Sequence, residues 1–368
     1  MSSPTTVSTV TADGRETAGA PQPDVPAGVP RVLARCRDLV RPSLSAAIGR
    51  LHPWPGEMAA FSLGWCEVGG APADGSYEGK GLRQTLAVLC AEAVGAPGES
   101  AVPGAVAVEL VHTFSLLHDD IMDGDGTRRQ RETVWKAYGT GPAVLAGDAL
   151  FALAVQTLAE TPGPQGTAAV GRLSGTLSDL VRGQAEDLLF AGRPWTGPGA
   201  VRTDEYRSMA ELKTGTLLGC SAALGALLGG APARTVATLD RAGRHLGVAF
   251  QAVDDLLGIW GDPAVTGKPV YSDLRQRKKT YPVLAALGGD GPRSGELAAL
   301  LNSPLPLDGD GAVRAAALVE ACGGRAATLD EARRHLDAAR ACLRSVPLVP
   351  RAAREIEALL GFLLHRRV

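Results

Sequence analysis

Apolar residues recur at spacings of three and four along almost the whole chain, and this pattern constrains the fold more than any other feature. Such spacing puts apolar side chains on one face of an α-helix. The pattern covers residues 31–51, 57–68, 80–95, 101–122, 141–160, 168–190, 203–230, 235–260, 278–288, 311–322, 325–345 and 351–365. Strand-type alternation never extends beyond a few residues, so we predict an all-α fold.

Glycine and proline gather between these segments and divide the pattern into separate helices. These breaks fall at 69–79, 95–98, 124–132, 161–166, 192–199, 261–270, 288–294 and 302–310. Residues 1–28 differ from the rest: they are rich in Ser, Thr, Ala, Gly and Pro and lack the apolar core of a signal peptide. We predict a disordered tail over 1–28 and one helical domain over 29–368.

Composition excludes several classes of function. The chain has 37 basic and 39 acidic residues, a near-neutral balance that gives no sign of binding to nucleic acid or to a membrane surface. The uncharged stretch from Thr214 to Ala233 is dominated by small residues. That content is typical of a helix packed inside a bundle, so we predict no membrane span. The six cysteines form no CxxC pair, which favours a reducing, cytoplasmic compartment.

Three carboxylates stand together at the end of the predicted helix 102–122. Asp119, Asp120 and Asp123 lie at positions i, i+1 and i+4, so they share one end of that helix. Like charges at this distance repel one another and raise each other's pKa. A divalent cation removes the repulsion, and Mg²⁺ takes one or two carboxylates together with substrate phosphates. The motif therefore predicts a magnesium–diphosphate site.

A second acidic pair matches the first. Asp254 and Asp255 come late in the predicted helix 235–260. Basic residues follow both clusters, and these are Arg128, Arg129, Lys268, Lys278 and Lys279. Carboxylates hold metal ions, while basic side chains bind the phosphate oxygens that the ions leave free. Facing helices of a bundle can bring two such clusters to one central cavity.

The motifs together resemble the trans-type polyprenyl diphosphate synthases, enzymes of isoprenyl chain elongation. The resemblance runs from about Val32 to the C-terminus. It rests on Gly79-Lys80-Gly81-Leu82-Arg83, the Asp119–Asp123 motif with Arg128-Arg129, Lys213-Thr214, Gln251 with Asp254-Asp255, and Gly267-Lys268, Ser272-Asp273-Leu274 and Lys278-Lys279-Thr280. It implies a helical bundle of the isoprenoid synthase type with a central active-site cavity.

The resemblance implies a metal-dependent site for an allylic diphosphate. Asp119 and Asp123 would bind two Mg²⁺ ions and Asp254 a third, with Asp120 and Asp255 completing the acidic set. The metals act as Lewis acids on the diphosphate, the C–O bond ionises to an allylic cation, and the departing diphosphate serves as the final base. The residues implied around this diphosphate are Arg128, Lys213, Thr214, Gln251, Lys268 and Lys278.

The second substrate, isopentenyl diphosphate, needs a cationic pocket without metal. Lys80, Arg83, His112 and Arg129 match the family positions for that pocket. Lys80 and Arg83 lie three residues apart at a predicted helix start, which would point them the same way. Taken alone, that pair is more typical of a solvated helix face. His112 alone is more typical of a core histidine, but it precedes Asp119 by two helical turns on the same stripe.

The chain departs from the family pattern at two places. Many relatives carry a third aspartate where this chain has Gly258, and we consider Asp262 as a partial replacement. Gly81 and Gln84 stand where relatives often have Arg and Pro. Gln184 and Asp187 resemble a family segment that faces the cavity, while His118 is expected to point elsewhere.

The residues just before Asp119 predict the length of the product. In the family, a bulky residue here forms the floor beneath the growing chain. Phe114 lies about 7.5 Å of helix rise before Asp119, and Ser115 is its small neighbour. One aromatic with a small neighbour resembles synthases of the C20 product, geranylgeranyl diphosphate. Farnesyl and longer polyprenyl products remain alternatives, and a phenylalanine in an apolar helix is often only core packing.

Two other classes remain open at this stage. A type I terpene cyclase shares the fold and the first aspartate motif, but it would ordinarily replace the second with an Asn/Ser/Glu triad. A non-catalytic partner subunit could lose an aspartate motif, and here neither is lost apart from Gly258. The family resemblance implies a homodimer. The sequence does not identify the allylic primer or the pathway served.

Overall fold

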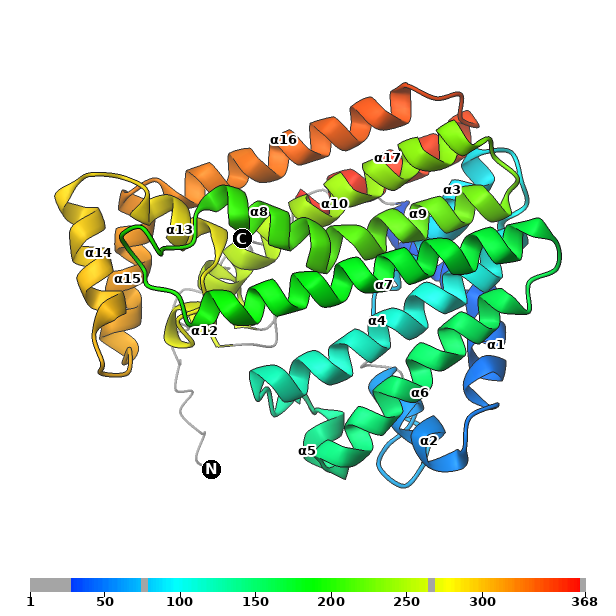
Figure 1. Cartoon of the computed structure of the whole chain (residues 1–368), viewed down its shortest axis with the longest axis horizontal. Helices are drawn as coiled ribbons and strands as arrows, with labels where there is room; N and C mark the ends of the chain where they lie inside the picture. The colour runs from blue at the N-terminus through cyan, green and yellow to red at the C-terminus, as the bar shows by residue number, and fades with distance from the viewer. Residues whose placement is uncertain (1–27, 74–78, 264–268, 365–368) are drawn as a thin grey trace, which may run out of the picture.

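The computed structural model describes residues 28–73, 79–263 and 269–364 and confirms the all-α fold (Figure 1). The predicted tail lies almost wholly outside these residues. The first half contains α1 (Val29–Ile48), α2 (Pro53–Ser62), α3 (Leu82–Ala93), the 3₁₀ turn η1 (Gly98–Ala101), α4 (Val102–Asp123), α5 (Val134–Tyr138), α6 (Thr140–Ala159) and α7 (Pro164–Ala191).

The second half continues the bundle and adds a smaller group of helices at one end. It contains α8 (Thr203–Ala210), the π-helical segment η2 (Glu211–Gly215), α9 (Thr216–Leu228), α10 (Ala233–Trp260), α12 (Ser272–Arg275), α13 (Tyr281–Leu287), α14 (Pro292–Asn302), α15 (Gly309–Ala321), α16 (Gly324–Arg344) and α17 (Pro350–Leu364). Figure 1 shows α14 and α15 (yellow and orange) at the end of the molecule farthest from α1.

Helix α9 lies inside the bundle. Every residue from Thr216 to Ala226 is buried, and α9 packs against α3, α4, α7 and α10. Glycines allow α9 and α10 to approach closely, since a Cβ atom added at Gly243 would lie 2.5 Å from the backbone oxygen of Leu218. The prediction that the uncharged stretch forms a packed helix is therefore confirmed.

Two helices have the length and composition of a membrane span among the residues that the structure describes. They are the continuous run Gly98–Asp123 and helix Thr140–Ala159. In the most apolar 18 residues of each, 61% of the first and 39% of the second are buried. The first is thus a core helix of the bundle. The second, α6, keeps part of its apolar face exposed.

The helix boundaries differ from the prediction at several places. The helix expected at 57–68 is α2, which starts earlier because Pro53 occupies its first turn and His52 accepts a hydrogen bond from the backbone of Trp54. The single helix expected at 203–230 is interrupted by η2. Helix α14 was not predicted: its short apolar pattern contains Gly295 and lies between two glycine- and proline-rich breaks.

A two-stranded hairpin lies within the break predicted at 124–132. Strands β1 (Thr127–Arg128) and β2 (Arg131–Glu132) pair antiparallel. The turn residues Arg129 and Gln130 have φ of 52° and 62°, a left-handed conformation that costs free energy in residues with a side chain. This turn fixes the positions of Arg128 and Arg129 beside the end of α4.

Candidate active site

One large cavity collects nearly all of the predicted site residues. Its volume is about 1460 Å³. The predicted residues that line it are Lys80, Arg83, His112, Phe114, Ser115, Asp119, Asp123, Arg128, Arg129, Lys213, Thr214, Gln251, Asp254, Asp255 and Lys278. Asp120 is not among the lining residues, and Lys268 lies outside the described residues.

The end of α4 presents two of its three aspartates to the cavity. Gly124, with φ of 69°, ends the helix directly after Asp123. Asp120 is buried instead, and the Arg128 side chain contacts its Oδ1 through Nη2 at 2.7 Å and Nε at 2.8 Å. Asp120 thus holds Arg128, which itself lines the cavity.

The electrostatics at Asp119 favour a bound cation. Burial raises the pKa of this carboxyl to about 6, the charge of Asp123 adds to the rise, and Lys213 opposes it. The surrounding protein therefore does not fully compensate the negative charge on this wall. A cation with oxygen-ligand preference would relieve it.

The opposite wall is built by η2 and α10. Lys213 donates to Asp187 Oδ2 at 2.7 Å, and the Thr214 hydroxyl donates to Gln251 Oε1 at 2.9 Å. Both η2 residues line the cavity. A π-helical turn contains one more residue than an α-helical turn, and such turns are frequent at functional sites.

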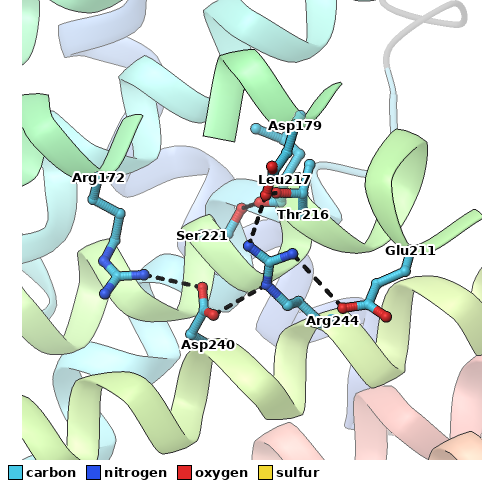
Figure 2. A network of polar contacts seen from close by, with 8 residues as sticks. All are labelled: Arg172, Asp179, Glu211, Thr216, Leu217, Ser221, Asp240 and Arg244. Carbon is cyan, nitrogen blue, oxygen red and sulfur yellow. Dashed lines mark hydrogen bonds and ion pairs between the residues drawn. The ribbon is translucent and has the colours of Figure 1, made fainter. Parts of the chain in front are cut away.

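Figure 2 shows how η2 is braced from behind by a network centred on Arg244 of α10. The guanidinium of Arg244 contacts Asp179 of α7 at 3.2 Å, Asp240 at 3.1 Å and Glu211 of η2 at 3.7 Å. Gly219 makes room for this side chain, because a Cβ atom there would lie 2.8 Å from Arg244 Cγ. The network joins η2 and α10, which build this wall, to α7.

The two aspartates of the second motif have different surroundings. Asp254 and Asp255 both line the cavity, but their partners differ. Asp255 is buried and accepts hydrogen bonds from the Tyr206 hydroxyl at 2.6 Å, the Tyr281 backbone at 2.9 Å and Gln251 at 2.9 Å. Burial raises the pKa of Asp255 to about 7, and the hydrogen bonds from Tyr206 and Gln251 oppose this rise. Asp255 is therefore committed to protein partners.

Asp273 lies where the third aspartate of the second motif would extend. A Cβ atom added at Gly258 would be 1.9 Å from Asp273 Oδ2. Asp273 lines the cavity and Asp262 does not, so the geometry favours Asp273 over the expected Asp262 as the nearest replacement. Asp273 belongs to the Ser272-Asp273-Leu274 motif, but it was not predicted as a site residue.

The pocket predicted for isopentenyl diphosphate is formed by α3, α4 and the hairpin. Arg83 Nη1 lies 3.1 Å from His112 Nε2. Burial lowers the pKa of His112 well below its ordinary value, and the nearby Arg83 and Arg129 lower it further. A neutral His112 can accept a hydrogen bond from Arg83 and still present one N–H.

Glu109 is a further residue of this pocket, and none of the motifs contains it. It is buried among the basic residues, lines the cavity and accepts a hydrogen bond from the Gln84 backbone at 3.1 Å. Burial raises its pKa, and Arg83 opposes the rise. Glu109 is the only acidic residue of the predicted helix 101–122 before Asp119, and its place one turn before His112 could have indicated it.

The expectation that Lys80 and Arg83 share the start of one helix is wrong. Helix α3 begins at Leu82, and Gly81 has φ of 63°. Lys80 therefore precedes the helix, and a spacing of three does not align it with Arg83. Both side chains line the cavity because the backbone turns at Gly81, not because they share a helix face.

The proposed floor residues line the same cavity. Phe114 packs edge-on against His118, with ring centroids 4.9 Å apart, and against Phe151 of α6 at 5.7 Å. Ser115 donates to the backbone oxygen of His112 at 2.8 Å. His118 also borders the cavity, and its Nε2 lies 3.2 Å from the oxygen of Val144.

The acidic residues fit magnesium only in combination with a ligand. Asp119, Asp123 and Asp254 offer hard oxygen donors on facing walls. Over the described part of the chain, no three His, Cys, Asp or Glu side chains stand close enough to hold an ion by themselves. Mg²⁺ that takes few carboxylates and shares phosphate oxygens suits such an arrangement.

The chain is similar to known proteins over most of its length. The sequence pattern of the Polyprenyl synthetase family matches residues 73–305. A (2E,6E)-farnesyl diphosphate synthase of Mycobacterium tuberculosis is 42% identical over 94% of this chain and 97% of its own length. A geranylgeranyl diphosphate synthase of the same species is 47% identical over 80% of this chain and 82% of its own.

A solved structure gives the same result. The crystal structure of a polyprenyl synthetase from Streptomyces coelicolor A3(2) covers 91% of this chain and 99% of that chain, with 47% identity and a TM-score of 0.85. These relationships favour a synthase over the terpene cyclase and the non-catalytic subunit. The chain belongs to the polyprenyl synthetase family and is a polyprenyl diphosphate synthase.

Proposed function

We propose that the enzyme condenses isopentenyl diphosphate with allylic diphosphates and releases geranylgeranyl diphosphate, the C20 product. The relatives described above include one farnesyl and one geranylgeranyl synthase, so similarity leaves the length open. Phe114 carries the proposal. It lines the cavity upstream of Asp119, two further rings support it, and its neighbour Ser115 is small.

Asp119, Asp123 and Asp254 are the residues that would hold magnesium, about three ions in all by the family resemblance. When bound, Mg²⁺ makes the diphosphate a better leaving group by drawing electron density from its oxygens. Asp120 and Asp255 act differently in this proposal. Their carboxylates hold Arg128 and Gln251 in place, so they position site residues and are not direct metal ligands.

The basic residues of the same region bind the allylic diphosphate. Arg128, Lys213 and Lys278 line the cavity beside the acidic walls, and Lys278 also pairs with Asp123 at 3.1 Å. Lys268 lies outside the described residues, and we include it in this set because it matches the family motif in the sequence. Thr214 and Gln251 direct polar oxygens toward the region where the allylic cation forms, which lowers the energy of the transition state.

Isopentenyl diphosphate binds in the second pocket without metal. Lys80, Arg83 and Arg129 supply positive charge there, and neutral His112 supplies a hydrogen bond. The two diphosphates then lie in one cavity.

We also propose a homodimer formed through α6 and α7. These helices pack on one another and expose large apolar side chains, which are Val144, Leu145, Phe151, Val181, Leu188 and Leu189. Exposed apolar patches of this kind mark association surfaces. We retain one domain over 29–368 and a cytoplasmic location as parts of the same proposal.

A primer series tests the proposed activity. Purified protein is incubated with Mg²⁺, isopentenyl diphosphate and the C5, C10 or C15 allylic diphosphate, and the products are identified by mass spectrometry after phosphatase treatment. We expect C20 as the end product from each primer. A C15 end product, or a distribution extending well beyond C20, would contradict the assignment of length.

A further inference from the structure

A buried carboxylate outside the cavity is connected to the cavity wall by hydrogen bonds that are linked through Tyr281 and through the neighbouring residues Tyr206 and Arg207. Glu331 of α16 is 1% exposed and is not among the cavity residues. We propose that Glu331 is a positioning residue for the reaction: it fixes Asp255, and through Asp255 the pair formed by Gln251 and Thr214. This inference rests on the proposed role of that pair beside the allylic diphosphate.

The first connection runs through Tyr281, the first residue of α13. Its hydroxyl donates to Glu331 Oε2 at 3.1 Å, and its backbone N–H donates to Asp255 Oδ2 at 2.9 Å. The N–H groups of a first helical turn have no partner within the helix. Tyr281 therefore bridges two buried carboxylates. A shift of Glu331 would move the Tyr281 backbone N–H that donates to Asp255.

The second connection runs through two consecutive residues of α8. Arg207 pairs with Glu331 through its Nε and Nη2. The preceding residue, Tyr206, donates its hydroxyl to Asp255 Oδ2 at 2.6 Å. The rings of Tyr206 and Tyr281 meet edge-on with centroids 6.1 Å apart. Both connections thus end on the same oxygen of Asp255.

The inner part of the chain sets the polarity of the cavity wall. The Gln251 amide nitrogen donates to Asp255 Oδ1 at 2.9 Å, so its carbonyl oxygen is left to accept from Thr214. The Thr214 proton is thereby committed to Gln251. The lone pairs of the Thr214 oxygen remain for the cavity, where they place partial negative charge near a developing cation.

The surroundings of Glu331 explain why a charged residue occupies this buried place. Besides Arg207, Arg334 pairs with its carboxylate, and His335 Nε2 lies 3.2 Å from Oε1. Removing the negative charge leaves these basic groups without their shared partner. Without this charge, α8 and α13 lose their contacts with Glu331, and Tyr206 and Tyr281 are held less firmly against Asp255.

The test compares Glu331→Gln, Tyr281→Phe and the double variant with a control on the same helix, Thr328→Val. Thr328 is fully buried and donates only to the Gly324 oxygen within α16. We expect Glu331→Gln and Tyr281→Phe each to lower kcat roughly tenfold or more, the scale of a small displacement at a reacting centre. The KM for isopentenyl diphosphate should stay unchanged, since its pocket lies on other elements.

The double variant separates positioning from general loss of stability. If both residues act through Asp255, the double variant should be no slower than the slower single variant, while Thr328→Val lowers the melting temperature without lowering kcat. Wild-type kcat in Glu331→Gln overturns the inference. The inference is also overturned if Thr328→Val and Glu331→Gln lose equal stability and show an equal fall in kcat.

Two further variants show which proposal has failed. Thr214→Val and Gln251→Leu remove the inner pair itself. Wild-type kcat in both would overturn the proposed role of the pair and this inference with it. A lowered kcat in both, together with wild-type kcat in Glu331→Gln, overturns the positioning role of Glu331 alone.

Discussion

Phe114 is held in the cavity wall by contacts with two other aromatic rings. His118 and Phe151 pack edge-on against it, and Gly147 leaves room for His118, since a Cβ atom there would lie 2.3 Å from its Nε2. A ring supported in this way does not turn aside easily when a growing chain reaches it. Its removal should therefore change the depth of the cavity directly.

Opposite substitutions at the two floor positions should change product length in opposite directions. We expect Phe114→Ala to release products longer than C20, because the wall recedes, and Ser115→Phe to stop at C15, because a second ring shortens the space. Mass spectrometry of the dephosphorylated products measures both. An unchanged product spectrum in the two variants would mean that the floor lies elsewhere.

Gly258 is a residue whose missing side chain can be tested by a paired substitution. An added Cβ atom would occupy the place of the Asp273 carboxylate. Gly258→Ala should therefore lower kcat by displacing Asp273, and Gly258→Asp should do the same despite restoring the family pattern. Gly258→Asp combined with Asp273→Ser should recover much of the activity. In this double variant residue 258 supplies the carboxylate that Asp273 no longer supplies, and the smaller serine leaves room for it.

The measurements are kcat and the melting temperature of each variant. If Gly258→Asp alone has the kcat and the melting temperature of the wild type, then Asp273 can move without effect. Its position beside Gly258 would then not matter for activity. A double variant that is folded but slower than either single variant would argue against the exchange of one carboxylate for another.

Among the elements, η2 shows how a local irregularity serves the site. Gly247 of α10 faces η2 so closely that an added Cβ atom would lie 2.3 Å from Gly215 Cα. The Gly215 Cα and N atoms, at 2.3 and 2.7 Å, belong to the backbone, which cannot rotate away as a side chain can. The contact fixes the π-helical turn that carries Lys213 and Thr214 into the cavity.

Gly247→Ala should destabilise the fold by about 1–3 kcal/mol, the usual cost of overpacking, and should lower kcat because η2 shifts. Gly175→Ala on α7 is the control, since no atom lies within 4 Å of its added Cβ. That change should stabilise the helix by roughly 0.5–1 kcal/mol. Urea denaturation measures both. Equal stability of the two variants would show that the contact is not tight.

The periodicity of apolar residues predicted most of the long helices, but not η2, α14 or the short helices α5 and α12. The extra residue of a π-helical turn leaves the spacings of three and four intact on either side, so 203–230 looked like one helix. Helix α14 is short and begins at Pro292, where the composition indicated a break. The hairpin depends on left-handed backbone at Arg129 and Gln130, which their residue types do not indicate.

For the whole molecule, the exposed apolar face of α6 and α7 is the clearest feature without a partner in the single chain. Leu145→Glu and Leu189→Glu should convert the proposed dimer to a monomer, because each puts a charge into the contact. Leu305→Glu is the control, since Leu305 is 72% exposed and lies in the α14–α15 connection. Light scattering after size exclusion measures the mass. A monomeric wild type would refute the dimer.

Most of the cavity-lining residues that the family motifs contain could be predicted from sequence, because those motifs are local, but Glu109 and Asp273 were not. The partners of the lining residues could not be predicted. Asp120 pairs with Arg128 across the end of α4, and Asp255 meets Tyr281 and Tyr206 from two other helices. Residues far apart in the chain meet there only once the bundle has formed, so no local pattern indicates which carboxylates face the cavity.

We propose that one cavity holds two diphosphate pockets, of which only the one between α4 and α10 needs metal. Titration calorimetry with isopentenyl diphosphate and with inorganic pyrophosphate, each with Mg²⁺ and with EDTA, tests it most directly. We predict that isopentenyl diphosphate binds with the same affinity in EDTA as in Mg²⁺, and with the same affinity to Asp119→Asn as to the wild type. Pyrophosphate should bind at a second, separate site only when Mg²⁺ is present, and Asp119→Asn should lose this site. Loss of isopentenyl diphosphate binding in EDTA, or metal-independent binding of pyrophosphate at the second site, would contradict the account.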